Sequence, residues 1–109
     1  MNTYLEKSKE IPIIADVDVL VCGGGPAGVG AAIRAGRMGA DVMLIEAFDC
    51  LGGIATAGMM SHWTGHSSSK VLAEIFKRSY EKCQILGYAE ENDCPDYTIN
   101  QEVLKLVLE

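Results

Sequence analysis

Residues 17–28 read Val-Asp-Val-Leu-Val-Cys-Gly-Gly-Gly-Pro-Ala-Gly, and this stretch decides the fold of the chain. An apolar, β-branched run leads into three consecutive glycines, and a run of small residues follows them. A second apolar run then ends in Glu46. We predict a strand over residues 17–22, a helix over 26–38 and a second strand over 41–46. Because a helix connects the two strands, they are expected to be parallel neighbours in an α/β fold.

Each residue type in the glycine turn has a physical reason to be there. Gly23 permits the tight turn out of the strand, and Gly25 lets a phosphate approach the backbone without meeting a Cβ atom. Gly28 lets the helix pack close to the strand, and Pro26 suits the first helical turn. With Ala27 between them, these residues are predicted to bind the pyrophosphate of a dinucleotide. The alternative is a glycine turn that serves packing alone.

The end of the second strand indicates which dinucleotide to expect. The N-terminus of the predicted helix offers free N–H groups and the positive end of its dipole to phosphates, and the loop contains no lysine. Glu46 stands where a carboxylate can accept hydrogen bonds from ribose hydroxyls while repelling a 2′-phosphate. FAD or NAD is therefore favoured over NADP.

Composition bounds the size of the protein and its partners. The chain has 109 residues, enough for one small domain, and its net charge of −6 argues against nucleic acid or an anionic membrane as a partner. Charged residues stand near the start of the chain, where a signal peptide needs an apolar core, and no apolar run approaches the length of a membrane span. We therefore expect a cytoplasmic protein.

The cysteines and histidines are weak candidates for a metal site. The four cysteines show no C-x-x-C spacing and are predicted to be reduced structural thiols, with Cys22 and Cys83 on buried faces. His62 and His66 are four residues apart, but the surrounding glycine and serines disfavour a helix that would align their rings. Ordinary loop histidines are the favoured interpretation, a place near flavin or substrate is the second, and no metal is predicted.

The remaining segments divide the chain into an arm and one domain. Residues 1–16 are predicted to form an N-terminal arm, in which an Ile-rich run around Pro12 suits an edge strand. The domain then covers residues 17–109, and its long Gly-, Ser-, Thr- and Met-rich connection over residues 47–69 is typical of a functional segment. A helix is predicted over residues 70–86. One face of this helix is predicted to be core, namely Leu72, Ile75, Phe76, Tyr80 and Cys83.

The last helix starts at one of two caps. Either Thr98 forms a capping box with Gln101, or Asn100 is the cap itself. The apolar side of this helix comprises Val103, Leu104, Val107 and Leu108. No stop signal precedes Glu109, so we expect the chain to be the N-terminal part of a longer domain with an incomplete doubly wound parallel sheet. In that case the apolar faces of both helices that follow the second strand, and the outer edge of the sheet, lack their usual cover.

Three segments together resemble a known group of proteins. Residues 18–28, 43–46 and 51–58 are similar to the FAD-dependent oxidoreductases of the two-dinucleotide-binding-domain type, which have a Rossmann-like FAD/NAD(P)-binding fold. Within that group the likeness is greatest to the bacterial and archaeal "FAD dependent oxidoreductase" family, which includes relatives of the flavin subunit of heterodisulfide reductase. The likeness covers residues 17–109 and implies FAD as cofactor. It leaves the catalytic residues, the small-molecule substrate and the electron donor or acceptor undefined, and it allows an iron–sulfur partner domain outside this chain.

The resemblance also implies a second contact to the cofactor, because it places Gly52, Gly53 and Thr56 near the flavin-side phosphate and the ribityl chain. The arginine that often precedes this glycine pair in related flavoproteins is absent, and Cys50 stands two positions before Gly52. The cysteine positions of dithiol disulfide reductases are occupied here by Ala55 and Met60, so that class is excluded. The alternatives to an FAD-binding segment are the NAD-binding domain of a dehydrogenase and a truncated dinucleotide-binding module without turnover.

Overall fold

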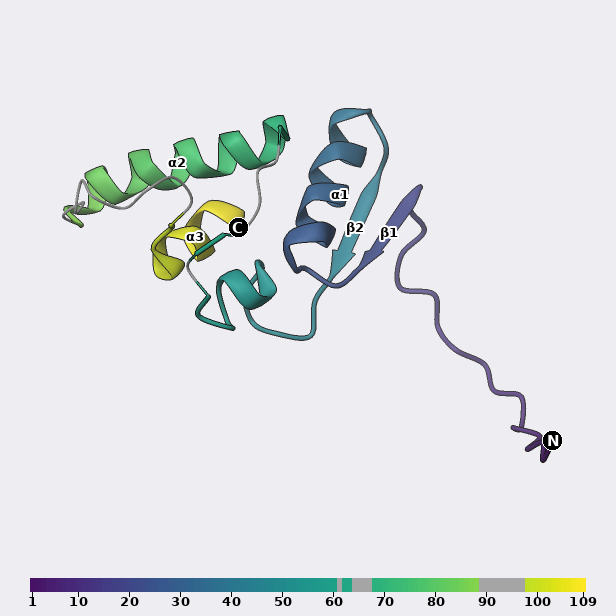
Figure 1. Ribbon diagram of the computed structural model, residues 1–109. Helices are drawn as coiled ribbons and strands as arrows, with labels where there is room; N and C mark the ends of the chain where they lie inside the picture. Colours follow the sequence, from purple (N-terminus) through teal and green to yellow (C-terminus); the bar gives the residue numbers. More distant parts are fainter. Residues whose placement is uncertain (61, 64–67, 89–97) are drawn as a thin grey trace.

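The computed structural model describes residues 1–60, 62–63, 68–88 and 98–109. These residues form a small α/β fold whose two strands are parallel, consistent with a partial Rossmann-like fold (Figure 1). In chain order the elements are β1 (Val19–Cys22), α1 (Pro26–Arg37), β2 (Val42–Ile45), the 3₁₀ turn η1 (Gly53–Ala55), α2 (Lys70–Leu86) and α3 (Gln101–Leu108). The predicted fold class is confirmed, and β1, α1 and β2 are each slightly shorter than the sequence pattern suggested.

The βαβ unit is built as the sequence pattern predicts. In the parallel sheet Val19 lies opposite Val42, and Cys22 lies opposite Ile45. Helix α1 covers one face of this sheet (Figure 1). The helix ends at Arg37 and is capped by Met38, and the next residue, Gly39, has a φ of +91°, a left-handed conformation that glycine adopts without strain.

Side-chain caps define the starts of α2 and α3. Ser69 Oγ accepts a hydrogen bond from the N–H of Leu72 at 3.4 Å. At α3 the side-chain oxygen of Asn100 accepts from the N–H groups of Glu102 at 3.0 Å and Val103 at 3.2 Å. Of the two caps that the sequence allowed for the last helix, the structure therefore has Asn100.

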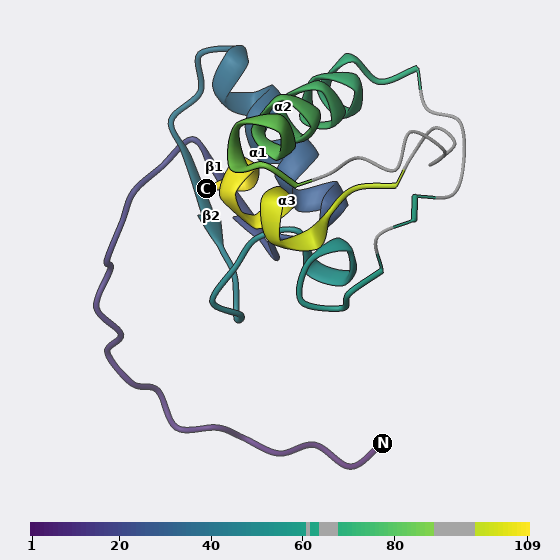
Figure 2. The same ribbon diagram turned by 90° about the vertical axis from the view of Figure 1, so that its left-hand side faces the viewer.

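The core lies among the helices, on the side of α1 that faces away from the sheet. Helices α2 and α3 pack beside each other there, with η1 next to them (Figures 1 and 2). The buried apolar residues are Val29, Ala55, Ile75, Ile99, Val103 and Leu104. The expectation that the apolar side of α3 lacks cover is wrong for Val103 and Leu104, whose exposed fractions are 0% and 1%. The reason is that α3 packs against α2, and Leu104 joins one core cluster with Ile75 of α2 and Val29 of α1.

The opposite face of the sheet is open to solvent. Leu20 and Ile45 are 54% and 48% exposed, and Cys22 is exposed as well. The expectation of a buried Cys22 on a strand covered on both faces is therefore wrong, because α1 covers only the face to which Val19 and Val21 contribute.

Helix α2 also departs from its predicted core face. Tyr80 is 52% exposed, whereas Ser79 beside it is 2% exposed. The apolar face predicted for this helix is wider than the part of α2 that α1 and α3 cover, and Tyr80 lies outside the covered part. Toward its start, Phe76 packs its ring edge-on against Trp63, with 5.9 Å between ring centroids.

The N-terminal segment extends away from the domain. Residues 1–17 contain no helix or strand, and Ile11, Ile13 and Ile14 are exposed (Figure 1). The edge strand expected around Pro12 is absent because this segment does not pair with β1 or β2. Among the described residues, no helix is both long and apolar enough to cross a membrane.

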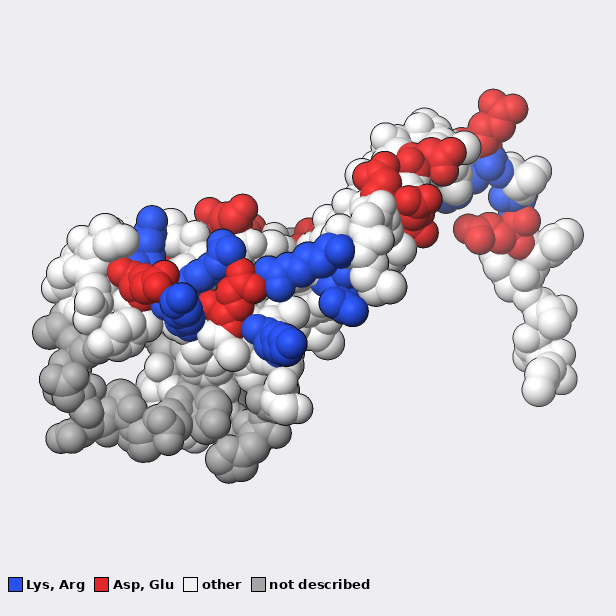
Figure 3. Space-filling model, turned by 90° about the horizontal axis from the view of Figure 1, so that it is seen from above, with Lys and Arg blue, Asp and Glu red and all other residues white. Residues whose placement is uncertain are grey.

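Charged side chains connect the helices on one surface. Lys and Arg gather over α1 and α2 in the view from above, with acidic side chains among them (Figure 3). Glu74 of α2 bridges Arg37 of α1 and Arg78 of its own helix, each at 2.7 Å. The neighbouring arginines lower the pKa of Glu74, Arg37 having the larger effect. The ion pair with Arg37 links α2 to α1.

Candidate functional site

Two glycine loops meet at the start of α1. The N–H of Gly52 donates to the carbonyl oxygen of Gly24 at 2.7 Å. A Cβ atom on Gly53 would lie 3.0 Å from Cα of Gly25, so the two backbones are in close contact. The structure therefore brings the second glycine pair beside the first glycine turn, although 26 or more residues separate them in sequence.

The first loop fits an incoming phosphate. Gly23 has a φ of +102°, and its N–H donates to the carbonyl oxygen of Ile45 at 2.8 Å. A Cβ atom on Gly28 would overlap the carbonyl oxygen of Gly23, which explains the close packing of α1 on the strand. A Cβ atom on Gly25 would meet nothing within 4 Å. Gly28 is thus required by the protein's own packing, whereas the space beside Gly25 is open.

The first turn of α1 supplies donors for an anion. The helix begins at Pro26, and its first hydrogen bond runs from the N–H of Val29 to the carbonyl oxygen of Gly25 at 2.9 Å. The N–H groups of Ala27 and Gly28 precede this bond and have no acceptor within the helix. No acidic residue lies in this turn. The positive end of the helix dipole therefore faces this position, and no acidic side chain of the turn itself competes with an incoming anion.

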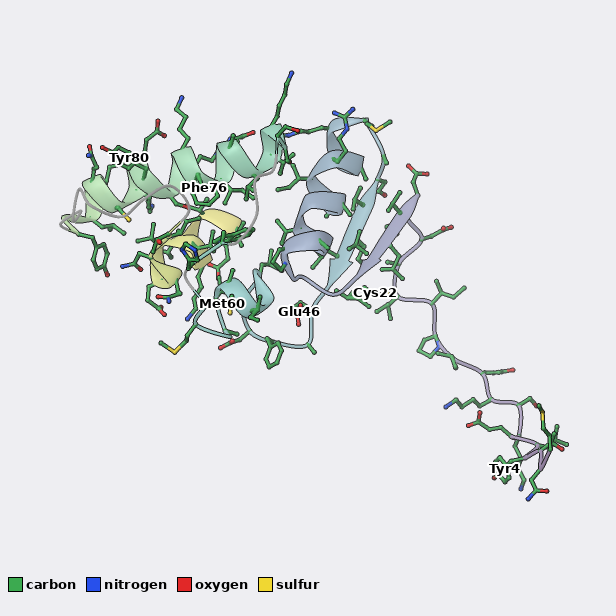
Figure 4. All side chains as sticks on the ribbon, viewed as in Figure 1. Tyr4, Cys22, Glu46, Met60, Phe76 and Tyr80 are labelled. Carbon is green, nitrogen blue, oxygen red and sulfur yellow. The ribbon has the colours of Figure 1, made fainter. Side chains whose placement is uncertain are left out.

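Glu46 lies at the carboxyl end of the sheet, beside the start of α1 (Figure 4). One oxygen of its carboxylate accepts from the N–H of Gly24 at 2.5 Å. The other oxygen accepts from the N–H groups of Ala47 at 2.6 Å and Phe48 at 3.0 Å. These backbone donors lower the pKa of Glu46, Phe48 and Gly24 having the largest effects. The carboxylate is therefore ionised near neutral pH and held in one place.

Gly24 is the site residue that reasoning from the sequence missed. A Cβ atom there would lie 2.6 Å from Cδ2 of Leu51 and 3.0 Å from the carboxylate oxygen of Glu46. Its backbone contacts both Glu46 and Gly52. The sequence feature that could have indicated its role is its place as the middle glycine of Gly23–Gly25, a position at which the dinucleotide-binding pattern allows any residue.

The second loop has an unusual backbone and a buried centre. Gly52 and Gly53 have φ angles of +104° and +54°, which favour glycine. Thr56 is 1% exposed, and its hydroxyl donates to the carbonyl oxygen of Leu51 at 2.6 Å. Of the residues predicted near the flavin-side phosphate, the two glycines therefore face the first loop, while Thr56 lies inside its own loop.

A cleft of about 580 Å³ lies behind the two loops. Pro26, Ala27 and Gly52 contribute to its lining, and the remaining walls come from α1, α2 and α3 together with Trp63 and Ser69. Apolar side chains such as Ile75 and Leu104 form much of this lining. Arg34 and Lys70 also belong to this lining.

Other candidate residues are not brought to this site. His62 pairs with Thr98, with 3.4 Å between Nδ1 and Oγ1, and His66 lies outside the described residues. Among the residues that the structure describes, no three potential metal ligands gather in one place. Cys22, Cys50 and Cys83 form no disulfide bond within the described residues, and Cys94 lies outside the described ranges.

Comparison with known proteins agrees with this geometry. Residues 18–109 match the family described as "FAD dependent oxidoreductase". Two similar proteins, each named "Fumarate reductase (cytochrome)", come from Shewanella frigidimarina and from its strain NCIMB 400, and both are 43% identical over 68 residues. That match covers 60% of this chain but only 12% and 11% of those proteins. No solved structure matches the chain significantly. The chain belongs to the FAD dependent oxidoreductase family, and its cofactor is FAD.

Proposed function

We propose that this chain is the segment of a flavin-dependent oxidoreductase that holds the ADP half of FAD. The observation that carries the proposal is the hydrogen bond between Gly52 and Gly24, which joins the second glycine loop to the first at the start of α1. The joined loops and the adjoining Glu46 supply complementary contacts for a pyrophosphate and a ribose.

The pyrophosphate is expected at the N-terminus of α1. Its hydrogen-bond donors are the backbone N–H groups of Ala27 and Gly28, and the missing side chain of Gly25 leaves room for a close approach. The free N–H groups and the helix dipole supply the attraction, since the loop contains no lysine. Gly23 and Pro26 are expected to act on the protein's own structure, because Gly23 forms the turn after β1 and Pro26 begins α1.

The ribose is expected at Glu46. Oε1 of Glu46 already accepts from two backbone donors, whereas Oε2 accepts only from Gly24, so Oε2 can still accept from a ribose hydroxyl. The same negative charge would repel a 2′-phosphate. Glu46 is therefore proposed to select FAD over dinucleotides that carry that phosphate.

When bound, the flavin would supply the redox chemistry, and the residues described here would hold and orient its ADP half. The names of the two relatives concern fumarate, but the matched 68 residues are a small part of those proteins and do not indicate a substrate for this chain. The electron donor or acceptor and an iron–sulfur partner domain stay predictions from the family resemblance.

The test is a titration of the full chain with FAD, followed by flavin fluorescence, and then displacement by competitors. ADP is expected to displace FAD because it carries both the pyrophosphate and the ribose. The 2′-phosphorylated form of ADP is expected to compete roughly tenfold more weakly or worse. Riboflavin is the matched control, since it lacks every group that the two loops are proposed to bind. Failure of ADP to displace FAD would overturn the assignment of this site.

A further inference from the structure

The hydroxyl of Thr56 is fully engaged inside the second glycine loop. It donates to the carbonyl oxygen of Leu51 at 2.6 Å and accepts from the thiol of Cys50, with 3.8 Å between sulfur and oxygen. The carbonyl oxygen of Gly53 lies 3.4 Å away. With the residue 1% exposed, neither the hydroxyl nor the methyl group faces solvent. In this geometry Thr56 offers nothing to a cofactor directly.

The same side chain shapes the backbone around it. A Cβ atom on Gly52 would lie 2.5 Å from Cγ2 and 2.7 Å from Oγ1 of Thr56, so the glycine backbone wraps tightly around the threonine. The N–H of Thr56 also donates to the carbonyl oxygen of Gly53 at 3.1 Å. Thr56 therefore lies inside the second glycine loop and contacts Gly52, Gly53 and the carbonyl oxygen of Leu51.

The loop that Thr56 holds is the one that contacts the first glycine turn. The N–H of Gly52 reaches Gly24, and Gly53 packs against Gly25. Loss of the bond to Leu51 would free the peptide plane directly before Gly52 to rotate. The N–H of Gly52 would then no longer be held toward Gly24.

We propose that Thr56 is a positioning residue for FAD, acting through Gly52 and Gly53 rather than by touching the cofactor. This proposal rests on the proposed function, because it assumes that the joined loops bind the pyrophosphate. In this proposal the hydroxyl group of Thr56, rather than the volume of its side chain, holds the second loop in position. Thr56→Val, which replaces the hydroxyl by a methyl group of similar size, is therefore the informative change.

The experiment compares Thr56→Val and Thr56→Ser with the parent chain and with a matched control. Ser79→Ala is that control, because Ser79 is 2% exposed and its hydroxyl on α2 has no partner in the described structure. Two quantities are measured: the FAD dissociation constant and the rate of amide hydrogen exchange over residues 51–56 in the FAD-free protein. Thr56→Val is expected to weaken FAD binding roughly tenfold and to accelerate exchange at Gly52. Thr56→Ser and Ser79→Ala are expected to retain parental values for both.

The outcomes separate this proposal from the proposed function. Weaker FAD binding with unchanged exchange at Gly52 would indicate direct contact and overturn the positioning role, as would parental affinity in Thr56→Val. If the parent chain itself does not bind FAD, the proposed function fails, and the exchange rates alone decide whether Thr56 holds the loop. Thr56→Ala replaces Thr56→Val if thermal melting shows that the valine variant is unfolded, with the same expectations.

Discussion

The carbonyl oxygen of Gly24 accepts a hydrogen bond from the N–H of Gly52, with 2.7 Å between the two atoms. This bond joins the turn after β1 to the segment that follows β2. Because the N–H of Gly24 also donates to Glu46, one residue contacts both the expected ribose acceptor and the second loop. A change in either loop is therefore expected to affect the other.

The first prediction separates binding from stability within the first glycine turn. Gly25→Ala should weaken FAD binding roughly tenfold or more while leaving the melting temperature unchanged, because its Cβ atom enters the space proposed for the pyrophosphate and meets no protein atom. Gly28→Ala should lower the melting temperature, because its Cβ atom overlaps the carbonyl oxygen of Gly23. Calorimetric melts and FAD titrations measure the two effects.

Gly36→Ala is the control for this pair. Gly36 lies on α1, a Cβ atom added there would meet nothing within 4 Å, and alanine suits a helix better than glycine. FAD affinity should stay at the parental value in this variant. Parental affinity in Gly25→Ala as well would place the pyrophosphate elsewhere.

The second prediction concerns Glu46. Glu46→Ala should weaken FAD and ADP binding roughly tenfold to a hundredfold, because the ribose hydroxyls lose a charged acceptor. The preference for ADP over its 2′-phosphorylated form should also shrink, since the repelling charge is gone. Isothermal titration with both nucleotides checks this. An unchanged ratio of the two affinities would mean that another residue reads the ribose.

The third prediction follows from the lowered pKa of Glu46. Its carboxylate is more stable ionised in the folded chain than in the unfolded one, so it stabilises the fold above the unfolded pKa of about 4.3. That stabilisation is lost as the pH falls through the lower, folded pKa. The difference in unfolding free energy between the parent and Glu46→Gln should therefore be constant above about pH 5.5 and shrink toward acid.

Comparing the parent chain with Glu46→Gln isolates the contribution of the Glu46 carboxylate to the pH dependence of stability. Glu74 also has a lowered pKa, but it is present in both proteins and its contribution cancels. Urea unfolding at a series of pH values gives the free energies. A difference that grows as the pH falls from about 5.5 would contradict the sign of the shift.

Much of the local structure could be predicted from the sequence, because it depends on neighbours in the chain. Gly39 and Gly87 stand just after the ends of their helices in left-handed conformations, and Pro26 begins α1, as their residue types indicate. Which face an element buries depends instead on what packs against it. Cys22 is exposed because no described element covers its side of the sheet, and Tyr80 is exposed beside a buried Ser79.

The candidate site divides in the same way. The glycine spacing and the acid after β2 could be recognised in the sequence, since each belongs to a local pattern. The bond from Gly52 to Gly24 and the burial of Thr56 depend on how the second loop folds back, and no short-range pattern encodes that path. The bond from the N–H of Gly24 to Glu46 was missed because it too joins residues far apart in the chain.

The fourth prediction tests the core around α3. Leu104 is 1% exposed, so Leu104→Ala should cost about 2–5 kcal/mol of unfolding free energy through lost burial and a new cavity. Leu106 on the same helix is 53% exposed, so Leu106→Ala should cost less than about 1 kcal/mol. Urea denaturation of both variants checks the contrast. Equal costs would mean that α3 is not packed as described.

The last prediction concerns the open face of the sheet. Leu20 and Ile45 are about half exposed on adjacent parallel strands, and neither outer edge of the two-stranded sheet is paired within the described residues. An apolar face beside free strand edges favours association between copies of the chain. We therefore expect the 109-residue chain to self-associate increasingly with concentration. Leu20→Lys should suppress this association, because a charge on that face would be desolvated in any contact between sheets.

Leu106→Lys is the control for the open face, since it places the same charge on α3, on the side of α1 away from the sheet (Figure 1). Its association should match that of the parent chain. Sedimentation velocity over a range of concentrations measures the three proteins under one set of conditions. Leu20 lies on the open face of the sheet, whereas Leu106 does not. A parent chain that stays monomeric, or an equal effect of both lysines, would therefore show that copies of the chain do not associate through the open face.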